Sequence, residues 1–198
     1  MIYFIFSFSF FKMFTLIVGP MFSGKSSLLL NYERRFTIAN KNILTINHSF
    51  DRRYSETGQI TTHDQITSTS KDHMSVSTDH MDQIINNDYG DFHDFDVILI
   101  DEIQFFNPLD RFISYWSNMG KLVIASGLNS DYKMQPFSSM NCLYSIADKI
   151  IHICATCSKC GEDAPFTKRL INDNTTQVAV GGAESYEPRC RKCFNLQD

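Results

Sequence analysis

The chain of 198 residues has no excess of positive charge. Its 18 lysines and arginines are outnumbered by 22 aspartates and glutamates, which gives a formal net charge of −4. A protein that holds a nucleic-acid duplex needs a basic surface against the phosphates. The composition therefore argues against a dedicated DNA-binding protein, and an anionic small substrate would need a local site of its own.

The sequence also lacks an internal repeat, a low-complexity linker and an apolar run that could cross a bilayer. Residues 1–11 are apolar and rich in phenylalanine, but a spanning helix needs about 20 such residues. This run has no basic residues before it and no small-residue cleavage site after it, both of which a signal peptide would show. Because Met13 stands directly before the first expected strand, we interpret residues 1–12 as a dispensable extension.

Apolar and polar stretches alternate along the rest of the chain, which is 43% hydrophobic and 20% charged and can bury a sizeable core. Residues 49–73 are polar and predict a long loop with room for a short strand. Another expected helix begins at a cap, either Thr78 or Asp79. The patterns predict strands over 14–18, 42–46, 97–101, 121–126 and 149–153, and helices over 25–39, 78–87, 109–119 and 138–147.

Strands that alternate with helices predict an α/β fold with a mainly parallel sheet flanked by helices. The composition changes at Cys154, after which cysteines accumulate. We therefore expect an N-terminal extension over 1–13, an α/β domain over 14–153 and a small zinc-binding module over 154–198.

Residues 19–26 match the phosphate-loop pattern G-x-x-x-x-G-K-S, and they follow an expected strand and open an expected helix. Glycines allow the backbone N–H groups to curl around phosphate oxygens, and the helix N-terminus adds its positive end. Lys25 would reach the β and γ phosphates, and the Ser26 hydroxyl would bind Mg²⁺. The alternative is a tight strand-to-helix turn with a solvated lysine. The predicted loop consists of Gly19, Pro20, Met21, Phe22, Ser23, Gly24, Lys25 and Ser26.

A second motif, V-I-L-I-D-E over residues 97–102, places two acids at the end of an apolar strand. The carboxyl end of such a strand lies beside the phosphate loop in an open α/β sheet. Asp101 would hold Mg²⁺, directly or through water. Glu102 projects differently, because side chains alternate along a strand, and is available as a general base. The alternative is a carboxylate pair that caps the next turn.

Two C-x-x-C pairs, Cys157 with Cys160 and Cys190 with Cys193, predict one tetrahedral Zn²⁺ site. Four protein ligands leave no open position, so this zinc would be structural. In an oxidising compartment the same cysteines could instead form disulfides.

Two further cysteines need an interpretation. Cys154 forms an overlapping C-x-x-C with Cys157 and could compete for the metal, but Gly161 after Cys160 suits a knuckle turn. Cys142 lies in an expected helix and is interpreted as a small buried hydrophobe.

Five segments together resemble the type II thymidine kinases, which include the cytosolic cellular enzyme and its bacterial and poxviral relatives. They are the phosphate loop, D-R-R-Y-S at 51–55 with T-H-D at 62–64, D-E-I-Q-F-F at 101–106, F-T-K-R-L at 166–170, and G-G-A-E-S-Y at 181–186 before C-R-K-C. They occur in order over residues 14–194, nearly the whole chain.

The resemblance implies transfer of the γ-phosphate of ATP to the 5′-hydroxyl of thymidine, with Mg²⁺. Glu102 matches the family's catalytic base, and Arg53 an arginine that steadies the transferring phosphoryl group. Beyond the phosphate loop, the implied ATP and Mg²⁺ residues are Asp51, Arg52, Arg53, Asp101, Glu102, Ile103 and Gln104.

The resemblance also implies that the long segment between the two C-x-x-C pairs closes over the thymidine base. Its backbone at Gln177, Val178, Ala179, Val180 and Gly181 would line the pocket. The other implied substrate contacts are Met21, Phe105, Leu128, Tyr132, Phe137, Thr167 and Tyr186. The implied protein is cytoplasmic, forms a homo-oligomer (tetramer or dimer), and has no nucleic-acid or membrane partner.

Several positions depart from the family pattern, and one departure, Ser27-Leu28 in place of a common Thr-Glu, should matter little. Ile103 replaces a glycine or alanine, Asn129 an aspartate that many members carry, and Tyr132 a phenylalanine. The extra hydroxyl of Tyr132 could change the polarity of the pocket and the preference for thymidine. Two other classes stay open on the sequence: a P-loop NTPase switch or motor without a nucleoside substrate, and a zinc-ribbon nucleic-acid adaptor with a degenerate phosphate loop.

Overall fold

The computed structural model describes residues 13–48, 73–78, 92–106, 109–171, 176–177 and 181–196; for the strand at 73–78 it describes only the side chains at 74, 76 and 78. The structural statements below concern these residues. The proposed extension over 1–12 lies outside them.

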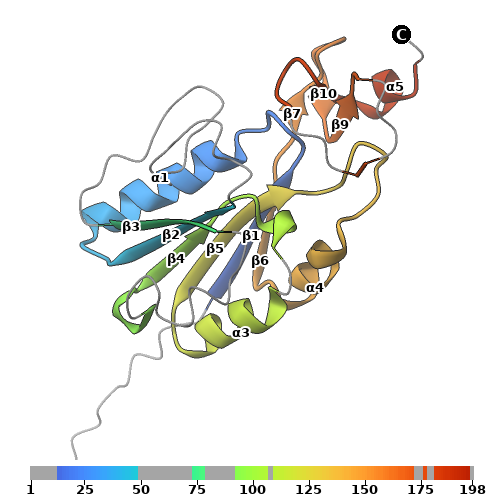
Figure 1. Cartoon of the computed structure of the whole chain (residues 1–198). Helices are drawn as coiled ribbons and strands as arrows, with labels where there is room; N and C mark the ends of the chain where they lie inside the picture. Colours follow the sequence, from blue (N-terminus) through green and yellow to red (C-terminus); the bar gives the residue numbers. More distant parts are fainter. Residues whose placement is uncertain are drawn as a thin grey trace, which may run out of the picture.

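A six-stranded sheet forms the centre of the molecule (Figure 1). Its order is β3-β2-β4-β5-β1-β6, and all five pairings are parallel, which confirms the predicted mainly parallel α/β sheet. The strands are β1 (Met13–Gly19), β2 (Ile43–His48), β3 (His73–Thr78), β4 (Val97–Ile100), β5 (Leu122–Leu128) and β6 (Lys149–His152).

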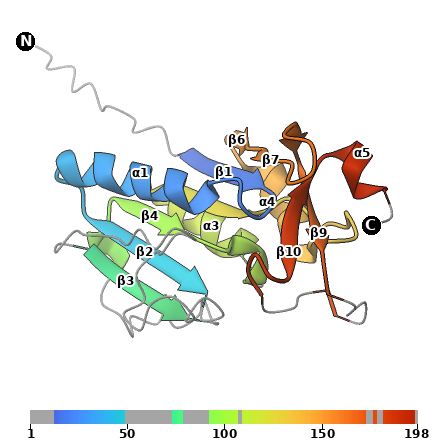
Figure 2. The same ribbon diagram turned by 90° about the horizontal axis from the view of Figure 1, so that it is seen from above.

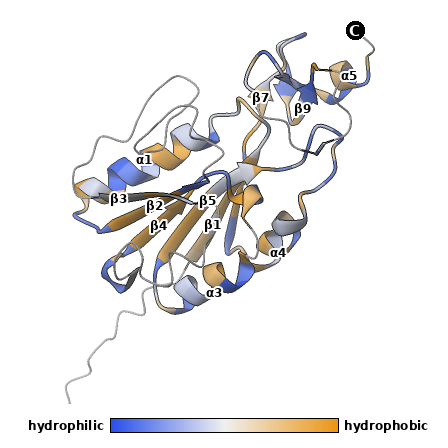
Figure 3. Cartoon of the chain, viewed as in Figure 1, coloured by the Kyte–Doolittle hydropathy of each residue, from blue (hydrophilic) through white to orange (hydrophobic). Residues whose placement is uncertain are grey.

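Helices cover both faces of this sheet (Figures 1 and 2): α1 (Lys25–Ile38) lies on one face, and α3 (Asp110–Asn118) and α4 (Ser138–Ile146) on the other. Side chains alternate along each strand, so β1 sends Ile17 toward Leu29 of α1, and Leu16 into the core that contains Trp116 of α3. Strands buried on both faces have continuous apolar sequences, and the central strands β4 and β5 are mostly hydrophobic in Figure 3. None of the described helices is long and apolar enough to cross a membrane.

Strand β3 corrects one expectation. Thr78, offered as a helix cap, is the last residue of this edge strand, which pairs with β2. Met74 and Val76 alternate with polar residues and pack into the core, a period-two pattern that indicates a half-buried strand. The rest of the helix predicted over 78–87 lies outside the described residues.

A smaller module follows β6 and lies at the carboxyl end of the sheet (Figure 1). It contains two antiparallel pairs, β7 (Ala155–Thr156) with β8 (Asp163–Ala164) and β9 (Phe166–Arg169) with β10 (Tyr186–Arg189), and the short helix α5 (Arg191–Phe194). It has its own small core of Ala155, Cys157, Ala164 and Cys193. Two 3-10 turns complete the described elements: η2 (Phe92–Asp94) and η3 (Ile103–Phe105).

Candidate functional site

The phosphate loop connects β1 to α1, and its backbone admits little variation. A Cβ at Gly19 would lie 2.3 Å from the carbonyl oxygen of Ile153 and 2.7 Å from Ser23 Oγ. Gly24 has a φ of 84°, and Phe22 also has a positive φ, 65°. Left-handed conformations are inexpensive only for glycine. This curled backbone is the form that directs successive N–H groups to one anion.

Lys25 opens α1 and is buried, with 7% of its side chain exposed. Its Nζ donates to the carbonyl oxygen of Pro20 at 2.7 Å. Burial lowers the pKa of the Lys25 ammonium, while the charges of Glu102 and Asp101 act in the opposite direction. The fold therefore brings the lysine of the first motif to the two acids of the second.

Asp101 directly follows β4, and one strand, β5, lies between β4 and β1. The Asp101 carboxylate is buried, and its Oδ1 accepts hydrogen bonds from Ser126 Oγ of β5 and from the backbone N–H of Glu102. Glu102 has a φ of 52°, an uncommon conformation for a residue with a side chain. The backbone therefore leaves the extended conformation of β4 at Glu102.

Gln104 fixes the Glu102 carboxylate against β5. Its Nε2 donates to Glu102 Oε2 at 2.6 Å, and its Oε1 accepts from the N–H of Leu128 at 2.9 Å. Its carbonyl oxygen accepts from Ser139 Oγ at 2.8 Å. A Cβ at Gly127 would lie 2.6 Å from Gln104 Oε1, so this position of β5 has no space for a residue larger than glycine. The side chain of neighbouring Ile103 is fully buried in the core, which leaves only its backbone to serve an ATP site.

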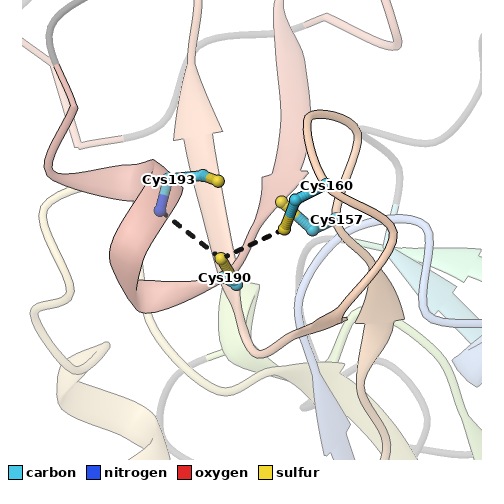
Figure 4. A group of neighbouring side chains, drawn as sticks. All are labelled: Cys157, Cys160, Cys190 and Cys193. Carbon is cyan, nitrogen blue, oxygen red and sulfur yellow. Dashed lines mark hydrogen bonds between the residues drawn. The ribbon is translucent and has the colours of Figure 1, made fainter.

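The four predicted zinc ligands converge at one point of the module (Figure 4). Their sulfur atoms all lie within 4.8 Å of one another, and the sulfurs of Cys160 and Cys190 are 3.6 Å apart. All six cysteines are free, which favours the metal over the disulfide interpretation. Cys154 is not one of the four. The expectation that Cys142 is buried is wrong, because it is exposed on α4.

The protonation chemistry of the cluster fits a divalent cation. Burial opposes ionisation of Cys157, but hydrogen bonds from the backbone of Cys190, Lys159 and Cys160 outweigh it and lower the pKa of Cys157 to about 6. Hydrogen bonds with Cys160 and Cys190 raise the pKa of Cys193 to about 12. Thiolates this close repel one another, and a bound metal is what allows all four to ionise.

The module touches the phosphate loop directly. Thr167 Oγ1 on β9 accepts from the N–H of Met21 at 2.9 Å. Asn129, after β5, donates from its backbone to the carbonyl oxygen of Gly19 at 3.3 Å and from Nδ2 to that of Pro165 at 3.1 Å. Two residues implied in substrate binding, Met21 and Thr167, are therefore in contact although they are 146 positions apart.

Two more groups of the implied substrate residues come together. The rings of Phe105 and Phe137 meet edge to face, with centroids 6.2 Å apart. Tyr132 and Tyr186 both lie against the guanidinium of Arg169, at 3.7 Å and 5.4 Å from their ring centroids. Leu128 packs beside the main core, and Gly181 is buried against Ser185. Phe105 lies on η3, Tyr132 and Phe137 lie in the connection between β5 and α4, and Tyr186 lies on β10 of the module.

A family model described as thymidine kinase matches residues 12–194. The chain belongs to the thymidine kinase family. It is 36% identical over 179 residues to the thymidine kinase of Raccoon poxvirus, with 90% of this chain and 94% of the relative covered. It is 35% identical over 182 residues to that of Choristoneura fumiferana entomopoxvirus, with 91% and 95% covered. A solved structure, the flagellar accessory protein FlaH from Methanocaldococcus jannaschii, matches with a TM-score of 0.48 and 15% identity over 71% of this chain and 70% of that one.

Some residues expected in the site of this thymidine kinase family member lie outside the described residues: Asp51, Arg52, Arg53, Val178, Ala179 and Val180. Conversely, sequence reasoning missed Ser126, Asp131 and the role of Arg169. Arg169 stood within the F-T-K-R-L match, but nothing in that run indicated its partners. The sequence showed only that Arg169 lies in a short run next to the apolar Leu170, which does not predict where its side chain binds.

Proposed function

We propose that this chain transfers the γ-phosphoryl group of ATP to the 5′-hydroxyl of thymidine. Membership of the thymidine kinase family supports the reaction class. The observation that carries the proposal is the meeting of buried Lys25 with the charges of Asp101 and Glu102, next to the module that carries Thr167. Phosphoryl transfer depends on such positioning and charge stabilisation more than on covalent chemistry by the protein.

The phosphate loop and Lys25 would bind the triphosphate, and Ser26 and Asp101 would hold Mg²⁺. Both hydrogen bonds found for Asp101 within the described part of the chain end on Oδ1, which leaves Oδ2 for the cation or its water. Mg²⁺ prefers such oxygen ligands and supplies neutralisation of charge on the phosphates. Arg53 would add positive charge near the transferring group.

Glu102 would accept the proton of the thymidine 5′-hydroxyl as its oxygen attacks the γ-phosphorus. The hydrogen bond from Gln104 Nε2 limits rotation of the Glu102 carboxylate, so that one orientation faces the substrate. A base held in one orientation avoids part of the entropic cost of reaching the reactive geometry.

The four-cysteine cluster would hold a structural Zn²⁺ that fixes both ends of the segment between the C-x-x-C pairs. A thiol-rich metal site suits a reducing compartment, which agrees with a cytoplasmic enzyme. Tethering both ends of a segment near the nucleoside helps to exclude water from the reaction.

The test is ATP-dependent phosphate transfer to thymidine by the intact protein and by Glu102→Gln. We expect kcat to fall by roughly 10²-fold or more in the variant, because the base is lost while the shape is kept. Folded, zinc-loaded protein that transfers no phosphate to thymidine would contradict the proposal. Robust ATP hydrolysis without thymidine would then support the NTPase-switch alternative.

A further inference from the structure

Arg169 is the last residue of β9, and its buried guanidinium joins four segments that are separate in sequence. It donates to the Tyr186 hydroxyl from Nε at 3.2 Å and from Nη2 at 2.9 Å. It also donates to the carbonyl oxygens of Thr176 (from Nη1, 2.8 Å) and Gln177 (from Nη2, 3.1 Å). Its carbon Cζ lies 3.7 Å from the ring centroid of Tyr132. Figure 2 shows β9 and β10, which carry Arg169 and Tyr186, side by side.

These contacts use properties that only arginine has. The planar guanidinium carries five N–H donors in a fixed fork and stacks on aromatic rings, whereas a lysine ammonium is a compact point charge. Arg169 stacks on Tyr132 with its flat face and donates to Thr176, Gln177 and Tyr186 from its edge. Because Arg169 and Tyr186 are both buried, losing this fork would leave polar groups without partners.

A second contact joins the segment at Gln177 to the turn that carries Tyr132. Gln177 Nε2 donates to Asp131 Oδ2 at 3.1 Å. The other oxygen of Asp131 accepts from the N–H groups of Lys133 and Gln135, each at 2.8 Å, and so shapes the turn that carries Tyr132. Gln177 of the module and Tyr132 of the β5–α4 connection are therefore held together both by Arg169 and by Asp131.

We propose that Arg169 is the positioning residue of the nucleoside site. It sets the two tyrosine rings and the backbone at Gln177 relative to one another, and these are residues that the proposed function assigns to the thymidine pocket. The inference rests on the proposed function for the identity of the nucleoside. The contacts named above for Arg169 do not involve Lys25, Asp101 or Glu102, so we expect a change at Arg169 to affect thymidine binding and not ATP binding.

The experiment compares Arg169→Lys and Arg169→Met with the matched controls Arg191→Lys and Arg191→Met. Arg191 is exposed in the same module and also stacks on a ring, with Cζ 4.6 Å from the Phe166 centroid. Four quantities are measured for each full-length variant: KM for thymidine, KM for ATP, kcat, and zinc bound per chain.

Both Arg169 variants should raise the KM for thymidine by about tenfold or more, since misplacement of contact groups by about 1 Å can cost as much as 10²-fold. The KM for ATP and the zinc content should stay within about twofold of the unchanged protein, as should all values for the Arg191 controls. An unchanged KM for thymidine would overturn the proposal, and so would equal rises in both KM values.

A double-mutant cycle keeps the test decisive if the Arg169 variants lose stability. Tyr186→Phe removes the hydroxyl that accepts two of the hydrogen bonds from Arg169 but keeps the ring. If Arg169 acts through Tyr186, the effects of Arg169→Met and Tyr186→Phe on kcat/KM for thymidine will be less than multiplicative. Independent effects would overturn the proposal. Failure of the proposed function is a separate result, namely no transfer to thymidine by the unchanged protein.

Discussion

The candidate site has two halves, which we propose bind the phosphates of ATP and the nucleoside, and they are constructed differently. The phosphate half uses a continuous loop, 19–26, after β1, and the end of β4, which is separated from β1 by β5. Its key side chains are therefore fixed by regular elements of the sheet. The nucleoside half draws on Tyr132, Thr167, Gln177 and Tyr186, which come from separate segments and meet through Arg169 and the cysteine cluster. The first half depends on local backbone geometry, and the second on cross-links between distant parts of the chain.

This difference predicts that the halves can be damaged separately. A change at a cross-link should weaken the nucleoside half and spare ATP binding. A change within the phosphate loop should do the reverse. The two halves touch through the contacts of Met21 with Thr167 and of Asn129 with Pro165, so changes at these residues should affect both.

Loss of zinc should have the largest effect. Cys193→Ser removes a proposed zinc ligand. Structural zinc in small modules contributes roughly 10–16 kcal/mol of binding free energy, which is also folding free energy. We expect zinc per chain to fall toward zero and thymidine phosphorylation to be lost, while ATP binding by titration calorimetry is retained. The control is Cys142→Ser, which changes an exposed cysteine on α4 outside the cluster. Full thymidine phosphorylation by zinc-free protein would contradict the claim that the nucleoside half depends on the cysteine cluster.

Gly19→Ala should damage the opposite half. The added Cβ would lie 2.3 Å from a backbone oxygen, which cannot move aside as a flexible side chain can. Overpacking of this kind costs about 1–3 kcal/mol, and ATP affinity should fall with it. Chemical denaturation and ATP titration measure both effects.

The matched control for that substitution is Gly120→Ala. Gly120 has a φ of 80° but nothing within 4 Å of an added Cβ, so only backbone strain of about 1–2 kcal/mol is expected, with ATP affinity unchanged. Equal loss of ATP affinity in both variants would show that close packing at Gly19 is not the cause.

Gln104→Leu should have an intermediate effect that is confined to kcat. Leucine keeps much of the volume but cannot donate to Glu102, so the base loses its orientation. We expect kcat to fall about tenfold with little change in either KM, as for loss of an interaction that matters in the transition state. The control Gln135→Leu alters an exposed side chain. A change in KM for ATP alone would instead assign Gln104 to nucleotide binding.

Asn129→Asp should have the smallest effect, although the family resemblance led us to expect an aspartate there. Aspartate cannot donate to the carbonyl oxygen of Pro165 as Asn129 Nδ2 does. Loss of one such bond costs about 1 kcal/mol, which lowers the Tm of a chain of this size by about 2–4 °C. Thermal unfolding monitored by circular dichroism would check this. The comparison is Asn118→Asp, which changes an exposed residue at the end of α3. A higher Tm would show that the contact with Pro165 does not stabilise the boundary.

Sequence patterns predicted the parallel sheet, and they placed the glycine-rich loop between a strand and a helix, because both depend on local signals. The apolar runs at 97–101 and 121–126 became β4 and β5 with small changes at the ends. The glycine-rich loop and its lysine, and the acids after β4, carry their chemistry in contiguous residues. Strand β3 was less visible in the sequence because its apolar residues are only Met74 and Val76, which alternate with polar residues.

The nucleoside half was less predictable because its partners are distant in sequence. The four cysteines could be identified by spacing, but the hydrogen bonds of Arg169 to Thr176 and Gln177 depend on how β9 and β10 pair. The same is true of Gln104, whose bridge from Glu102 to Leu128 exists only because β5 lies beside β4. Such residues become visible only after the topology is known.

The hydrogen bond from Met21 N–H to Thr167 has a thermodynamic consequence. It joins the phosphate loop to the strand that begins the nucleoside half, so a ligand that strengthens or weakens it changes the free energy of both regions. Linkage requires the two ligands to influence each other's affinity by the same factor, whichever binds first. If ATP and thymidine bind as proposed, we expect this contact to couple their affinities before any bond is broken.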